Sequence, residues 1–432
     1  MSSPLLSPYS PNTYSAIGTK GMCGHAAIFG FGRLFWWLVI PLHFSGFAHF
    51  LTFEYMKIHI LNTVCLPIRT GPAMTGAIRA KYWDDLGYEV ILFYPYVYLS
   101  FDQQNMYQCQ YTQSEYIQYL REAYSIPDTI QVVLYNVKPT YVMNWYMANI
   151  DDFTNEYKND ILFIEDPEPL YMSHPLIPHK LCINYKYVVL ICHTQYMSIA
   201  KLSMNHPLAT VGLDFMGTYV WGSTFIHPNL FVISISKAIS ANHNVCFNQS
   251  NHIVSGQIHG VNDKFFAIER DKTINTNQIY YIGKLERVHK CFDYMLNCAK
   301  RAKIKINVFG AGKDLDFIQS NPDNFTYKGI VLSPEQLDEY SIYVSFSDLE
   351  GLCTATAEAI VMNKICVIRK CDCNDVFANF DNVFFFNNEI EFKAIIEYVR
   401  TIQYIIPGDV SAFRWTNCNT ELRRLCQNIM RV

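Results

Sequence analysis

The chain has 432 residues, with 34 Lys and Arg against 38 Asp and Glu, so its formal net charge is −4. Half of the residues are hydrophobic and only 17% are charged, which excludes a disordered protein. Nucleic acid is not expected as a partner, because there is no basic excess to displace its counterions. The length corresponds to about two to three domains.

The 14 cysteines are scattered, and their spacings do not match a metal site. The closest pair is Cys371-x-Cys373, and several others lie within apolar runs, where a free cysteine behaves as a small hydrophobic residue. We therefore expect reduced structural thiols and a reducing compartment. No cofactor is expected, and the sequence leaves a metal requirement open.

Residues 34–53 form an apolar segment without Asp, Glu, Lys or Arg. Its length could span a bilayer, although Pro41 and two histidines weaken that interpretation. No convincing signal-peptide cleavage site follows the segment. For residues 1–55, three interpretations stay open: a membrane anchor, an aromatic interfacial segment, or an extension folded on the globular body.

From residue 56 onward, apolar strands alternate with amphipathic stretches. A strand at 58–64 is followed by a Pro- and Gly-containing loop at 66–72 and a helical pattern at 73–86. Further apolar runs predict strands at 89–94, 130–135, 161–165, 187–192 and 230–234. Such alternation is typical of parallel β-α-β units.

A second series of apolar runs begins after Gly260. It predicts strands at 279–282, 304–309, 325–328, 342–345, 365–368 and 383–386. The sequence therefore predicts two α/β halves that join near residues 250–275. Ligands of open parallel sheets bind beyond the carboxyl ends of the strands, so two facing sheets would enclose a cleft there.

Cations and glycines follow two strands of the second half. Lys284 and Lys290 come after the strand at 279–282 and could both bind a diphosphate, or could belong to a solvated loop. Gly310 and Gly312 form a turn that would let the backbone approach a ligand, or would only reverse the chain. The turn lacks the third glycine of the dinucleotide-binding fingerprint.

Two glutamates, Glu350 and Glu358, give the strongest local signal. Glu350 is expected in a loop, and Glu358 on a mostly buried helix over 353–362 that starts near Cys353 and Thr354. A carboxylate on a buried helix is costly unless it is paired, and sugar or ribose hydroxyls are natural partners. Free N–H groups at the helix start suit a phosphate. The alternative is a surface glutamate beside a capped helix.

Polar residues also follow strands of the first half. His193 comes directly after the strand at 187–192, in a position that suits an active site or a satisfied core histidine. Glu165 and Glu168 lie among prolines and could bind acceptor hydroxyls or be loop charges.

These residues together resemble a known family. The two glutamates eight residues apart, with two lysines upstream, resemble the retaining GT-B glycosyltransferases. More narrowly, the stretch LCTATAEA at 352–359 resembles the digalactosyldiacylglycerol synthases, as do the stretches at 66–71, 165–168, 193–196 and 259–265. The resemblance covers roughly residues 57–430.

The resemblance implies an α/β GT-B fold, in which two Rossmann-like domains face each other across a cleft, here with an apolar N-terminal extension. It implies transfer of galactose from UDP-galactose to monogalactosyldiacylglycerol with retention of the α configuration. Lys284 and Lys290 would bind the diphosphate, Glu350 the transferred sugar and Glu358 the ribose. His193 and Glu350 would be catalytic. The other implied donor residues are Gly71, Gly310, Gly312, Cys353 and Thr354, and the acceptor residues are Glu165, Glu168 and Tyr196.

The expected parts are the extension 1–55, an acceptor domain at 56–262, a nucleotide-sugar domain at 263–400, and a helical tail at 401–432 that crosses back to the first domain. Cys291, Gln195 and the loop at 286–289 depart from the family pattern. Another nucleotide sugar or acceptor, or an inactive sugar- or lipid-binding relative, therefore stays open, as does the oligomeric state. We expect membrane association, at the plastid outer envelope in a plastid-bearing source and otherwise on the cytoplasmic side of a membrane.

Overall fold

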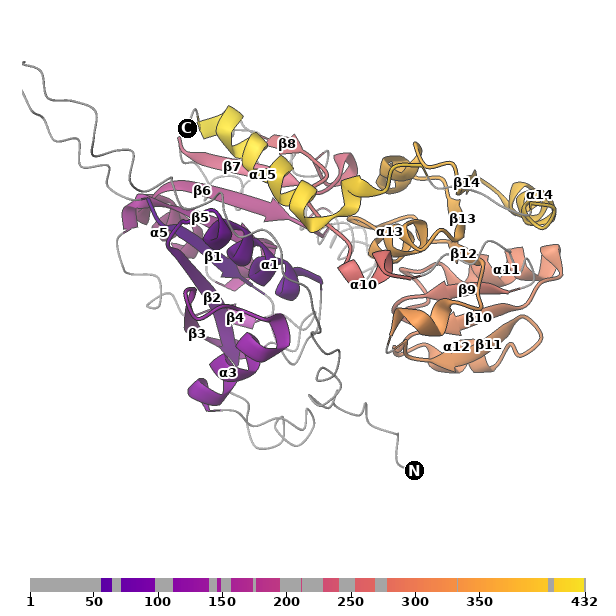
Figure 1. Cartoon of the computed structure of the whole chain (residues 1–432). Coiled ribbons are helices and arrows are strands. Elements are labelled where there is room, and N and C mark those ends of the chain that lie inside the picture. The colour runs from indigo at the N-terminus through magenta and orange to yellow at the C-terminus, as the bar shows by residue number, and fades with distance from the viewer. Residues whose placement is uncertain are drawn as a thin grey trace, which may run out of the picture. The chain divides into compact units, whose positions relative to one another are not determined.

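Two β-sheets organise the part of the chain that the computed structural model describes (Figure 1). The described residues are 56–63, 71–97, 112–139, 146–148, 157–173, 176–194, 211, 228–240, 253–268, 278–331, 333–402 and 408–430. All of them belong to the unit Met56–Val432. The expectations for residues 1–55, including the apolar segment 34–53, and for Tyr196 lie outside the described residues.

The first sheet has the strand order β4-β3-β2-β1-β5-β6-β7-β8, and all neighbours are parallel except β3 and β4. Its strands are β1 (Ile58–Asn62), β2 (Val90–Val97), β3 (Gln131–Pro139), β4 (Tyr146–Ala148), β5 (Tyr157–Glu165), β6 (Tyr185–Cys192), β7 (Leu230–Ser234) and β8 (Ile253–Ser255). β1 and β7 are buried along their whole length, as expected for parallel strands that are covered on both faces.

The second sheet is parallel throughout, with the order β11-β10-β9-β12-β13-β14. Its strands are β9 (Ile279–Ile282), β10 (Ile306–Phe309), β11 (Phe325–Gly329), β12 (Ile342–Ser345), β13 (Ile365–Arg369) and β14 (Val383–Phe386). In both sheets the chain starts in the middle, moves to one side and then crosses to the other. The crossing places a topological switch point between β1 and β5, and another between β9 and β12.

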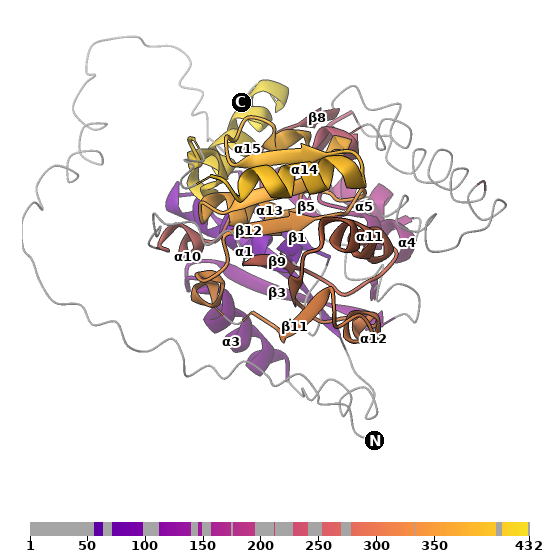
Figure 2. The same ribbon diagram turned by 90° about the vertical axis from the view of Figure 1, so that its right-hand side faces the viewer.

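Helices connect the strands, and their apolar faces complete the cores. In α11 (Phe292–Ala302) the buried residues recur at helical spacing, which seats one face of this helix in the core. The C-terminal helix α15 (Trp415–Met430) lies beside α1 (Gly71–Asp85) of the first sheet and near the end of β8 (Figures 1 and 2). The other helices within the described residues are α3 (Gln113–Tyr124), α4 (Glu168–Ser173), α5 (Leu176–Asn184), α10 (Asp263–Phe266), α12 (Leu315–Gln319), α13 (Thr354–Val361) and α14 (Glu389–Val399), with short 3-10 turns η4 (Pro334–Leu337), η5 (Asp372–Phe377) and η6 (Ser411–Phe413).

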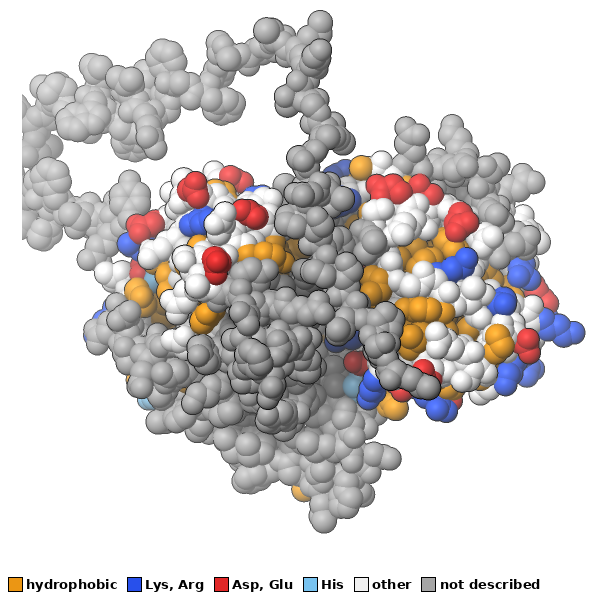
Figure 3. Space-filling view, turned by 90° about the horizontal axis from the view of Figure 1, so that it is seen from below, with side chains coloured by type: hydrophobic (Ala, Val, Ile, Leu, Met, Phe, Trp, Pro, Cys, Tyr) orange, Lys and Arg blue, Asp and Glu red, His pale blue; other side chains and the backbone are white. Residues whose placement is uncertain are grey.

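The architecture confirms the predicted pair of parallel, Rossmann-like sheets. Two short strands, β4 and β8, were not predicted, because three residues carry too little periodicity to be recognised. Within the described ranges, no helix combines the length and apolar character needed to cross a bilayer. Acidic, basic and hydrophobic side chains are interspersed over the described part of the face drawn in Figure 3, in keeping with the nearly balanced charge.

Candidate active site

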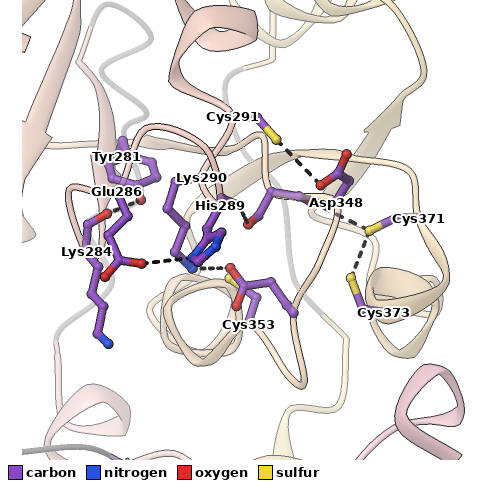
Figure 4. A network of polar contacts seen from close by, with 12 residues as sticks. Tyr281, Lys284, Glu286, His289, Lys290, Cys291, Asp348, Cys353, Cys371 and Cys373 are labelled. Atoms are coloured by element: carbon purple, nitrogen blue, oxygen red, sulfur yellow. Dashed lines mark hydrogen bonds and ion pairs between the residues drawn. The ribbon is translucent and has the colours of Figure 1, made fainter. Parts of the chain in front are cut away.

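The switch point of the second sheet brings Lys290 and Glu350 together. Lys290 follows β9, and Glu350 follows β12, the neighbouring strand on the other side of the switch point. The Lys290 ammonium donates a hydrogen bond to the Glu350 carboxylate (Figure 4), and the two side chains are only 20% and 16% exposed. Burial lowers the pKa of Lys290, but the charge and hydrogen bond of Glu350, together with Cys353 and Glu286, outweigh burial and raise that pKa overall. Lys290 is therefore a fixed cation beside the strand ends.

Lys284 provides a second cation at the end of the same strand. Its side chain is exposed, and in Figure 4 it points away from Lys290. Its carbonyl oxygen accepts a hydrogen bond of 3.1 Å from the Tyr281 hydroxyl, which fixes the backbone of the loop. The backbone of Lys284 is thus fixed, while its ammonium group stays accessible to an anion.

Gly310 and Gly312 hold this loop through backbone packing. Gly310 has φ +137°, and a Cβ atom there would lie 1.8 Å from the carbonyl oxygen of Gly283. A Cβ on Gly312 would lie 2.4 Å from the carbonyl oxygen of Leu285. Only glycine fits at either position. The two glycines therefore pack against the backbone of the loop that carries Lys284. Their expected contact with the donor stays a prediction.

Glu358 lies on α13, among residues that are mostly buried. Its side chain keeps a partial path to solvent, yet burial raises its pKa to about 8. Among the described residues, no side chain donates a hydrogen bond or offers a cation to this carboxyl group. The nearby Tyr280 hydroxyl is buried without a described partner. Glu358 is therefore a buried acid that is protonated at neutral pH and ready for a hydroxyl-bearing ligand.

The start of α13 lies close to the first sheet. Cys353 is the N-cap residue and is buried, and its side chain makes no capping hydrogen bond to the helix, whereas Thr354 is exposed. A Cβ atom on Gly351 would lie 1.8 Å from the carbonyl oxygen of His193, so the loop that carries Glu350 packs directly on the loop after β6. This contact brings the residues after β6 and β12 together.

A buried ionic network surrounds His193. Glu165, the last residue of β5, accepts hydrogen bonds from Arg79 Nε at 2.5 Å through Oε1 and pairs with His193 Nε2 at 2.6 Å through Oε2. The Arg79 and Glu165 side chains are completely buried. Burial alone would raise the pKa of Glu165, but Arg79 and His193 lower it overall. Glu165 is thus an ionised carboxylate that orients the His193 ring.

The network continues to the C-terminal helix. Arg79 also donates to the Ile258 carbonyl at 2.9 Å and to Asn419 Oδ1 on α15 at 3.2 Å. The His259 ring lies edge-on to His193, with ring centroids 5.6 Å apart, and its pKa is lowered well below the usual range by burial and by the neighbouring His193 and Arg79. No motif in the sequence points to a role for Arg79, Asn419 or His259, although His259 begins one of the stretches that carry the family resemblance.

The other expected acceptor and donor residues are placed as follows. Glu168 is buried at the first position of α4, after the switch point of the first sheet. Gly71 is the first residue of α1, and the loop before it lies outside the described residues. The burial of Glu165 between Arg79 and His193 favours a positioning role over the direct acceptor contact that was predicted.

Similar curated proteins are digalactosyldiacylglycerol synthases. The chloroplastic digalactosyldiacylglycerol synthase 2 of Lotus japonicus is 27% identical over 368 residues, which cover 78% of this chain and 76% of that protein. Synthase 2 of Glycine max is 26% identical and covers 77% of this chain and 74% of that protein. Synthase 1 of Glycine max is 25% identical over 78% of this chain, but over only 45% of its own length. No family model matches the chain.

Solved structures of glycosyltransferases share the fold. The lipopolysaccharide outer core galactosyltransferase WaaB aligns with a TM-score of 0.58 and 13% identity, over 86% of this chain and 99% of its own. The pneumococcal O-GlcNAc transferase GtfA, in complex with UDP and GlcNAc, aligns with a TM-score of 0.56 and 11% identity, over 88% and 100%. Anabaena HepE in complex with UDP aligns with a TM-score of 0.53 and 13% identity, over 87% and 99%. The chain has the GT-B glycosyltransferase fold.

Proposed function

We propose that this chain, a GT-B protein similar over most of its length to digalactosyldiacylglycerol synthases, transfers a hexose from a nucleotide sugar to a membrane galactolipid. The donor and acceptor that fit best are UDP-galactose and monogalactosyldiacylglycerol, with retention at the anomeric carbon. The observation that carries the proposal is the Lys290–Glu350 pair at the switch point of the second sheet, with Glu358 on the helix that follows.

The two lysines supply the positive charge that a departing nucleoside diphosphate needs. Lys290 is already held in place by Glu350, and Lys284 remains accessible at the same loop. Fixed cations aimed at developing negative charge stabilise a transition state without reorganisation. In this proposal the diphosphate binds between the two ammonium groups, and Glu350 turns toward the hydroxyls of the transferred sugar while it keeps Lys290 oriented.

The reaction itself exchanges one C–O bond for another. The bond between the anomeric carbon and the diphosphate breaks, the acceptor hydroxyl oxygen bonds to the same carbon, and the hydroxyl proton passes to the leaving phosphate. The resemblance implies attack on the same face of the sugar, so no carboxylate nucleophile is assigned. The packing of residue 351 against the His193 carbonyl supports a location for His193 next to the transferred sugar.

Glu358 makes UDP binding depend on pH. Ribose hydroxyls donate hydrogen bonds to the ionised carboxylate, so binding favours the form that has lost its proton. Because the free protein holds that proton up to about pH 8, affinity for UDP should rise with pH, approaching about tenfold per pH unit, and level off above the pKa. Titration calorimetry from pH 6 to pH 9 measures the trend. In Glu358→Gln the dependence should largely disappear, and an unchanged slope would remove Glu358 from the ribose site.

The acceptor half of the proposal rests on the chloroplastic galactolipid synthases to which the chain is similar. Their names support a plastid as the site of action, and a lipid acceptor would place the reaction at a membrane there. Glu168 and Tyr196 are the side chains we assign to the acceptor sugar. Glu165 pairs with His193 and orients it, and Arg79 in turn pairs with Glu165.

A substrate panel tests the proposed function. The purified chain is incubated with UDP- and GDP-hexoses and with mono-galactolipid or diacylglycerol in mixed micelles, and products are followed by mass spectrometry. We expect one hexose to be added to the galactolipid from UDP-galactose, with an α linkage by NMR. Release of UDP without a lipid-linked product would point to another acceptor, and the absence of any turnover or UDP binding would contradict a transferase.

A further inference from the structure

A pair of cysteines lies against the loop that carries Glu350. The sulfur atoms of Cys371 and Cys373 are 2.9 Å apart, at the start of η5 (Figure 4). Cys371 donates a hydrogen bond to the Ser347 carbonyl at 3.8 Å, and the backbone N–H of Glu350 donates to the Cys373 sulfur. The two thiols therefore support both ends of the loop between Ser347 and Glu350.

The two thiols differ in access and in acidity. Cys371 is partly exposed, whereas only 2% of Cys373 is exposed. The hydrogen bond between them lowers the pKa of Cys371 and raises that of Cys373. An accessible thiol of lowered pKa beside a second, buried thiol is the arrangement in which the first attacks an oxidant and the second resolves the product.

We propose that Cys371 and Cys373 are a redox-modified site, which a small disulfide such as glutathione disulfide oxidises to an intramolecular disulfide. The Cys371 thiolate attacks one glutathione sulfur, forming a mixed disulfide and releasing one glutathione. Cys373 then attacks the Cys371 sulfur and releases the second glutathione. The pair loses two protons and two electrons, and the electrons reduce one glutathione disulfide to two thiols.

Closure of the disulfide changes the support of the Glu350 loop. Cys371 loses the proton that it donates to the Ser347 carbonyl, and the two sulfur atoms must come closer together than 2.9 Å, which shifts sulfur atoms that contact the loop. Glu350 pairs with Lys290, and its neighbour Gly351 packs on the His193 carbonyl without space for a Cβ atom. Because this loop has so little free space, its displacement should lower sugar transfer. This consequence rests on the proposed function.

Peptide mapping tests the modification independently of activity. The full chain is incubated with glutathione disulfide, alkylated with iodoacetamide in denaturant and digested with trypsin. The tryptic peptide 371–393 starts after Lys370, ends at Lys393, the next basic residue, and contains no other cysteine. We expect this peptide to be unalkylated and two hydrogens lighter than the dithiol, and to become doubly alkylated after reduction with dithiothreitol. Double alkylation without reduction would overturn the proposal.

Two serine variants test the order of attack. Cys373→Ser should accumulate glutathione on residue 371, whereas Cys371→Ser should leave the buried Cys373 as a thiol; the reverse pattern would contradict the assigned roles. Oxidation should lower the rate of sugar transfer by the wild type several-fold and reversibly. It should not change the transfer rate of the double variant Cys371→Ser, Cys373→Ser. Formation of the disulfide without a change in transfer rate would overturn the proposed effect on the Glu350 loop. Absence of sugar transfer by the reduced protein would contradict the proposed function, but the disulfide found by peptide mapping would still stand.

Discussion

Lys290→Ala is expected to lower kcat/KM for sugar transfer by about 10²–10³-fold, the loss that follows removal of one preorganised group that stabilises transition-state charge. Lys290 is the largely buried cation at the switch point, and its replacement also leaves Glu350 without this ion-pair partner. The remaining carboxylate would then repel the diphosphate. Initial rates with labelled donor measure the effect, and thermal unfolding checks that the variant stays folded.

The matched control is Lys313→Ala, which removes an exposed cation from the loop after β10, one strand further from the switch point. Its transfer rate should stay close to that of the wild type, because an exposed charge in water contributes little. Lys284→Ala should fall between the two. If Lys290→Ala turned over as fast as Lys313→Ala, the assignment of Lys290 to the donor site would be wrong.

The second half of the site was accessible to sequence reasoning because its geometry follows from strand order. Lys290 and Glu350 are 60 residues apart, yet each follows a strand that can be recognised in the sequence as a short apolar run. Parallel strands end at one edge of the sheet, so polar residues after neighbouring strands meet. The predicted bounds of β9, β12 and β14 agree with the structure. β9 and β14 are bounded on both sides by polar or glycine residues, which mark their ends in the sequence.

The ionic network of the first half could not be predicted in this way. Arg79 lies within a helix and carries no motif, and its partners Glu165 and Asn419 are 86 and 340 residues away. Nothing in the local sequence separates this arginine from one on a solvated helix face. Its signal exists only in the tertiary structure, where α15 packs on α1. The pairing of Glu165 with Arg79 is likewise a tertiary contact. Without knowledge of that contact, the position of Glu165 after a strand suggested that it binds the acceptor.

Arg79→Met is expected to lower the free energy of unfolding by about 3–5 kcal/mol, because it leaves Glu165 as a buried carboxylate without its main cation. The Ile258 carbonyl and Asn419 also lose their donor. Urea unfolding at pH 7 measures the change. Lys393→Met is the matched control, since it breaks an exposed ion pair with Glu397 and should cost less than about 1 kcal/mol.

The double variant Arg79→Met, Glu165→Gln should recover part of this loss, because the amide carries no charge to desolvate. A pH series separates charge from packing. The pKa of Glu165 is lowered in the folded protein, so its pairing stabilises fully above the pKa of an unfolded glutamate, and this stability is lost as pH falls through the folded value. The gap between wild type and Arg79→Met should therefore narrow in acid. A gap that is constant with pH would mean that Arg79 acts through packing and hydrogen bonds to α15, and not through the charge of Glu165.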